Sequence, residues 1–176
     1  MDDASFGGWG IRTIAAGEAR YNPMSYHNGS IWPHDNAMAA AGLARYGFTD
    51  AATRILDAML DLSEAVDLHR LLELLCGFHR RSEQGPTLYP VACAPQAWAS
   101  GAVCLLLQAS LGMDIEAGRR RIAFCRPALP ASIERLSLTN LIVGDARLDL
   151  LLERQPTDVA VTVVKRDGDV EVVQLR

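Results

Sequence analysis

The 176-residue sequence has little of what marks a membrane or exported protein. It contains no uninterrupted apolar run that approaches the roughly 20 residues of a membrane-spanning helix. The N-terminal segment MDDASFGGWG is acidic and glycine-rich, and it lacks the basic start and apolar centre of a secretory signal. We therefore expect a soluble, cytoplasmic protein.

Positive charge is also scarce, since 17 Lys and Arg residues stand against 21 Asp and Glu residues, for a formal net charge of -4. Binding to nucleic acid normally requires clustered Lys and Arg. The short basic segment GRRRIAFCR, residues 118–126, is interpreted as a solvated turn between a helix and a strand, with a phosphate-binding patch as the alternative. We expect neither a nucleic-acid nor a membrane partner.

The four cysteines, at positions 76, 93, 104 and 125, lie far apart and form no C-x-x-C pair. This spacing predicts neither a zinc ribbon nor a redox motif. We expect reduced, mostly buried thiols and no cofactor.

Helical signals dominate the sequence up to residue 126. Ser30 can cap a helix that tolerates Pro33 and ends at Gly47, and Asp50 can cap a second, amphipathic helix. A third helix is predicted after Pro95, and because it is apolar nearly all round we expect it to be buried. The segment HRLLELLCGF predicts a further, short helix.

Strand signals replace the helical ones from residue 127. Four segments have the composition of strands, and the last two are separated by Asp167-Gly168, a hairpin signal. We expect a small antiparallel sheet. The sequence is therefore divided into a helical segment, residues 1–126, and a β segment, residues 127–176.

A polar and aromatic loop precedes the alanine-rich first helix. Planar rings can stack on the apolar faces of sugars, while Asp, Asn and His can hydrogen-bond to hydroxyl groups. The residues of this loop that suit sugar recognition are Tyr26, His27, Asn28, Ser30, Trp32, His34 and Asp35. A capped helix with a satisfied histidine is the alternative. No metal site is predicted, because the spacing of His27, His34 and Asp35 matches no zinc motif.

Glu73 is flanked by four leucines in RLLELLCGF. A carboxylate in such a segment is either paired, for example with Arg70, or held for chemistry. A glutamate on the surface of an amphipathic turn is the remaining interpretation.

Several long motifs resemble the C-terminal part of the amylo-α-1,6-glucosidase, or glycogen-debranching-enzyme-like, glycoside hydrolases. The motifs are GWGIRT, YNPMSYHNGSIWPHDNAMAAAGLARYG, LLELLCGF and YPVACAPQAWASGAVCLLLQASLG. They occur in the order of the family and cover most clearly residues 8–112. The resemblance implies part of an (α/α)6 barrel and inverting hydrolysis of glucosidic bonds.

Inversion requires one carboxyl group as proton donor and another as general base, about 6.5 to 9.5 Å apart. By motif, the resemblance implies that Glu73 is the general base, although Leu72 stands where the family has proline. The proton donor of such enzymes lies upstream of the matched motifs, and Asp35 is the second choice for a catalytic carboxylate. Gln96 and Trp98, in the last motif, complete the predicted set of sugar contacts.

Three long helices cannot close a ring of about twelve. The sequence therefore predicts a partial (α/α)6 barrel followed by a small antiparallel sheet, from a C-terminal fragment or truncated relative of a glucosidase that acts on α-glucans. The alternative is a non-catalytic carbohydrate-binding or assembly module. Expected partners are an oligosaccharide or α-glucan and either a second copy of the chain or an upstream chain that completes the barrel.

Overall fold

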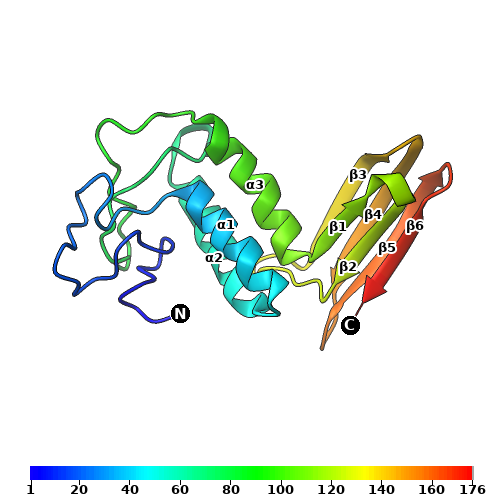
Figure 1. Cartoon of the computed structure of the whole chain (residues 1–176), viewed down its shortest axis with the longest axis horizontal. Helices are drawn as coiled ribbons and strands as arrows, with labels where there is room; N and C mark the ends of the chain where they lie inside the picture. The colour runs from blue at the N-terminus through cyan, green and yellow to red at the C-terminus, as the bar shows by residue number, and fades with distance from the viewer. Residues whose placement is uncertain (176) are drawn as a thin grey trace.

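The computed structural model describes residues 1–175, which form a helical part and a β part side by side (Figure 1). The helices are α1 (Pro33–Arg45), α2 (Thr49–Glu64) and α3 (Ala97–Ser110), with short 3-10 turns η1 (Asp67–His69) and η2 (Ala117–Arg119). The strands are β1 (Met113–Glu116), β2 (Arg121–Cys125), β3 (Arg135–Val143), β4 (Ala146–Arg154), β5 (Val159–Asp167) and β6 (Glu171–Leu175). Within residues 1–175, no helix has both the length and the apolar character needed to cross a bilayer.

The predicted partial (α/α)6 barrel followed by a single antiparallel sheet is wrong. The described residues contain three α-helices and two three-stranded sheets, with about 28% of residues in helix and 27% in strand. Three helices are too few to form a helical ring. They instead pack as one small group beside the sheets.

The three main helices form where the local sequence signals place them, but their starts differ. Trp32, not Ser30, is the N-cap residue of α1, and Phe48 is the N-cap residue of α2, so Asp50 lies in the first turn. Pro33 occupies the first helical position, where its missing N–H leaves no intrahelical bond unmade. The prediction that α3 is buried is wrong, because Trp98 and Val103 are exposed along it.

The short helix predicted around Glu73 does not form. The described chain is extended there instead, and Leu75 pairs with Ile31 on one side and Leu88 on the other as isolated antiparallel bridges. Gly77 passes so close to residue 29 that an added Cβ would lie 1.6 Å from the carbonyl oxygen of Gly29. The pairing with two distant segments outweighs the helix propensity of the leucines.

Buried polar side chains fasten the N-terminal loop to this extended segment. The Arg12 guanidinium, almost fully buried, donates to the Gly77 carbonyl at 2.7 Å and also to the carbonyls of Asp3 and Ala4. Asn36 exchanges hydrogen bonds with the backbone of Ile11. The irregular first 30 residues are therefore an ordered scaffold around the start of α1.

The β part consists of sheets in the orders β1-β2-β6 and β3-β4-β5, which share one hydrophobic core. The predicted hairpin at Asp167-Gly168 is wrong, since β5 pairs with β4 while β6 crosses to run parallel to β2. Gly168 does supply the left-handed turn, with φ of 91°. Strands β1 and β2 lie before residue 127, so sheet formation starts earlier in the chain than the sequence-based division.

Candidate functional site

Glu73 lies in the extended segment with its side chain only 7% exposed. Its Oε1 accepts a hydrogen bond from the Tyr26 hydroxyl at 2.6 Å, and its Oε2 accepts one from the Cys93 backbone N–H at 3.0 Å. The Glu73 N–H in turn donates to the Cys93 carbonyl at 3.0 Å. Two segments that are distant in sequence therefore fix the position of both carboxylate oxygens.

These donors make the ionised form of Glu73 the favoured one. The Cys93 backbone N–H, and after it the Tyr26 hydroxyl, lower the pKa of the Glu73 carboxyl. Conversely, the hydrogen bond to Glu73 raises the pKa of Tyr26 to about 12, and the negative charge of Glu73 raises the pKa of the Cys93 thiol. At neutral pH the site holds a carboxylate beside a protonated phenol, which suits a proton acceptor rather than a proton donor.

Six aromatic rings form what we call the aromatic cluster beside Glu73. Its members are Tyr26, His27, Trp32, His34, Tyr89 and Trp98. Tyr26 meets Trp32 edge-on at 4.8 Å between ring centroids, and His34 stacks on Trp98 at 4.0 Å with 17° between the ring planes. The edge-on geometry of Tyr26 and Trp32 is one that aromatic pairs prefer, whereas the His34 and Trp98 rings lie closer together than is usual.

The local sequence around Ser30 explains why Tyr26 and Trp32 meet. The buried Ser30 hydroxyl donates to the Tyr26 carbonyl at 2.6 Å, and it accepts the indole N–H of Trp32 at 2.9 Å. Ser30 thus joins the loop to the first turn of α1 rather than capping that helix. The first turn of α3 supplies Trp98, and the packing of α1 against α3 brings its ring onto His34.

The two tryptophans of the aromatic cluster differ in exposure. Trp32 is 5% exposed, whereas Trp98 is 50% exposed. Sugars stack on exposed ring faces, so Trp98 offers the accessible surface and Trp32 lies beneath it.

The structure brings eight of the nine predicted site residues together, and seven of them are joined by ring contacts, a hydrogen bond or an ion pair: Glu73, Tyr26, His27, Trp32, His34, Trp98 and Asp35, the last through its Oδ1 at 3.0 Å from His34 Nε2. Gln96 is the eighth, because its side chain helps to lower the pKa of Glu73. Asn28 is exposed at the loop, where its carbonyl accepts a hydrogen bond from the Asn22 N–H. The sugar contacts themselves remain predictions.

Sequence reasoning missed Tyr89 and Cys93. Tyr89 meets Tyr26 edge-on at 5.7 Å, and Cys93 contacts the carboxylate through its backbone. The motif YPVACAPQAW contains both residues, but a backbone donor leaves no mark on side-chain identity. The expectation of mostly buried thiols is also wrong, because of the four free cysteines only Cys76 is buried.

Two further observations bear on ligands at the site. Within residues 1–175, no three or more His, Cys, Asp and Glu side chains are grouped to hold a metal ion. The Nδ1 atom of His34 is buried and has no hydrogen-bond partner in this described part of the chain. An unsatisfied buried nitrogen costs free energy, and a bound ligand is one way in which such a group finds a partner.

The first 75 residues match a family model described as the mannosylglycerate hydrolase MGH1-like glycoside hydrolase domain. This part of the chain is similar to glycoside hydrolases. The match includes Glu73 and the aromatic loop, and it ends before Tyr89, Cys93 and Trp98. No curated protein matches the chain. The matching family supports the glycoside hydrolase resemblance, and its description does not name amylo-α-1,6-glucosidases.

Proposed function

We propose that this glycoside hydrolase-related chain binds an α-linked glycoside over the aromatic cluster and presents Glu73 as the general base of an inverting hydrolysis. The observation that carries the proposal is the environment of Glu73: a buried carboxylate, held ionised by donors on both oxygens, beside aromatic rings. An ionised, positioned carboxylate is the group that activates water in this mechanism.

In the proposed reaction, Glu73 takes a proton from water as the water oxygen bonds to the anomeric carbon. The bond between that carbon and the leaving-group oxygen breaks at the same time, and a separate acid protonates the leaving oxygen. Tyr26 holds Oε1 of the base at 2.6 Å, and the Cys93 amide holds Oε2. The lone pair that receives the proton is thereby aimed by two rigid contacts.

The proton donor is the missing half of the proposed mechanism. Asp35 is 53% exposed and contacts His34 at 3.0 Å, so it lacks the buried, apolar surroundings that are typical of a catalytic acid. We therefore assign Asp35 to sugar binding and propose that an upstream segment or partner chain supplies the acid. The chain alone is then expected to hydrolyse glycosides very poorly, because a positioned acid contributes about 10²- to 10⁴-fold in rate.

Two substrate classes follow from the two resemblances. The motifs suggest α-glucans of the kind that debranching enzymes cleave, and the matching family model is described by a mannosylglycerate hydrolase. We favour maltooligosaccharides, because rings and hydroxyl-binding groups at the site suit a neutral sugar. Mannosylglycerate is the comparison substrate, since it carries a carboxylate.

Binding and turnover can be tested separately with the purified chain. Calorimetric titration with maltotriose and with mannosylglycerate measures affinity, and release of reducing sugar measures hydrolysis. We expect maltotriose to bind, with negligible turnover, and Glu73→Gln to leave the melting temperature within a few degrees of the parent. Efficient hydrolysis that Glu73→Gln abolishes would show that the chain contains its own acid, against our assignment.

A non-catalytic binding module is the second candidate, favoured by the half-exposed Trp98 on its His34 support. Addition of an excess of the upstream partner, once identified, distinguishes the two. If the chain contributes the general base, the parent chain restores hydrolysis to the mixture with the partner, and the Glu73→Gln variant does not. If the chain is only a binding module, the mixture has equal activity with the parent chain and with the Glu73→Gln variant.

A further inference from the structure

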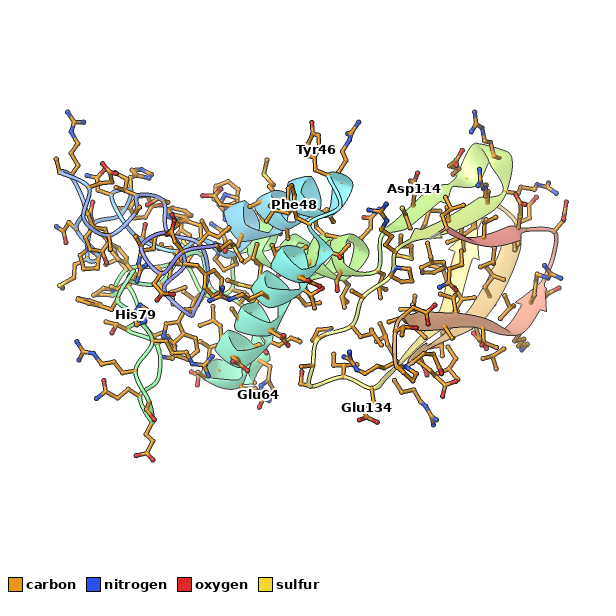
Figure 2. All side chains as sticks on the ribbon, turned by 90° about the horizontal axis from the view of Figure 1, so that it is seen from below. Tyr46, Phe48, Glu64, His79, Asp114 and Glu134 are labelled. Carbon is orange, nitrogen blue, oxygen red and sulfur yellow. The ribbon has the colours of Figure 1, made fainter. Side chains whose placement is uncertain are left out.

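A second hollow lies away from Glu73, where the helical and β parts meet. It has a volume of about 770 Å³ and is lined by the start of α2, the connection that follows β2, and the turn between β4 and β5. In Figure 2 the chain that leads to Glu134 passes beside α2, whose two ends are marked by the labels of Phe48 and Glu64. We call this hollow the junction cleft; its size falls within the range of ligand sites, which often lie at such junctions.

The charges that line the junction cleft are balanced. Three are carboxylates and three are guanidinium groups: Asp50, Asp57, Asp158, Arg54, Arg126 and Arg154. An anionic ligand would meet three carboxylates and a cationic one three guanidinium groups. The lining therefore favours a ligand without net charge.

Some of these charged groups serve the structure and others remain available. Arg154 donates to the carbonyls of Leu129, Pro130 and Ile133, and Asp57 accepts from the Ser132 hydroxyl at 3.5 Å. Asp50 and Arg126 have no ion-pair partner among residues 1–175, although both line the cleft. One acceptor and one donor of strong hydrogen bonds are thus left facing a shared space.

The rest of the lining has the mixed character of a sugar site. Threonine and glutamine side chains line the cleft together with four apolar residues that we call the apolar strip: Thr49, Thr53, Thr157, Gln155 and Gln174, and Pro127, Leu129, Pro156 and Val159. Of these polar groups, the Gln174 amide is already bonded to the backbone of Val159 and Val161. Hydroxyl-rich ligands have hydrogen-bond donors and acceptors at their edges and C–H groups on their faces. A surface that combines polar and apolar side chains can contact both kinds of group.

We infer that the junction cleft is a second binding site, for a neutral polyhydroxylated ligand of mono- or disaccharide size. Asp50 accepts ligand hydroxyl groups, Arg126 donates to ligand oxygens, and the apolar strip covers the C–H face. The site is separate from Glu73, so it binds whether or not the proposed function is correct.

Titration of the ¹⁵N-labelled chain with maltose, followed by NMR, locates binding residue by residue. We expect amide shifts at residues 49–53, 127–131 and 155–158, and we expect them to persist in Trp98→Ala, which removes the exposed ring of the other site. Asp50→Asn and Arg126→Gln should each weaken the cleft affinity at least fivefold. Glu64→Gln, a matched carboxylate at the far end of α2, should leave it unchanged.

Inorganic phosphate and glycine are the comparison probes, one anionic and one zwitterionic. Shifts in the cleft with either of these and none with maltose would overturn the neutral-ligand assignment. Absence of cleft shifts with maltose, glucose and myo-inositol at tens of millimolar would overturn the site itself. Thermal melts of Asp50→Asn and Arg126→Gln establish that a loss of binding is not a loss of folding.

Discussion

Trp32 and Trp98 allow one substitution to be compared in two environments. Both belong to the aromatic cluster, but Trp32 is 5% exposed and Trp98 is 50% exposed. If the cluster is a sugar site built on a packed base, Trp32→Ala should cost stability and Trp98→Ala should cost binding. The pair therefore separates scaffold from recognition within a single site.

The magnitudes follow from burial. Truncation of a buried Trp typically costs about 3 to 5 kcal/mol, and in a chain of this size 1 kcal/mol corresponds to about 2 to 4 °C. Trp32→Ala should thus lower the melting temperature by about 6 to 20 °C, and it also removes the indole donor to Ser30. Trp98→Ala loses a half-exposed ring stacked on His34, which should cost about 1 kcal/mol, or about 2 to 4 °C.

The effect on binding should be reversed. Loss of the exposed face of Trp98 removes about 1 to 2 kcal/mol of stacking and apolar contact, so maltotriose should bind about 5- to 30-fold more weakly. Differential scanning fluorimetry and calorimetric titration on the same preparations measure both quantities. Equal melting temperatures for the two variants, or unchanged affinity in Trp98→Ala, would refute the division between a buried and a ligand-facing tryptophan.

Three further substitutions test other parts of the structure. Tyr26→Phe removes a donor to Glu73, so the pKa of that carboxyl should rise toward its ordinary value. The ionised carboxylate contributes stability above its ordinary pKa, and this stability is lost as pH falls through the folded pKa, so the contribution should be smaller in this variant. A carboxyl ¹³C titration measures the Glu73 pKa. The control Tyr21→Phe, which removes a hydroxyl that donates to a backbone carbonyl, should leave that pKa unchanged. Gly77→Ala would put a Cβ 1.6 Å from a carbonyl oxygen, so denaturant titration should show a loss of about 3 kcal/mol or more. Gly101→Ala, in an exposed helical position with nothing within 4 Å, should instead gain up to about 1 kcal/mol, or about 2 to 4 °C.

Local signals predict the elements of this fold better than their partners. The helices around residues 33–45, 49–64 and 97–110 could be predicted from periodicity and proline, because such signals act within a few residues, although the predicted capping residues Ser30 and Asp50 are not the N-caps. The four strands after residue 127 could be predicted from alternation and β-branched residues. The Asp167-Gly168 hairpin could not, since β2 offers β6 a parallel partner that turn chemistry does not reveal.

The candidate site divides in the same way. The sequence alone identified Glu73 as an unusual carboxylate and the loop from Tyr26 to Asp35 as chemically rich, because those properties belong to the residue types. Tertiary structure decided that Glu73 is extended rather than helical, that Tyr26 lies on its Oε1 and that Cys93 lies on its Oε2. These contacts join residues 47 and 20 positions apart, and whether such pairs form depends on the packing of the whole chain. No local pattern encodes that packing.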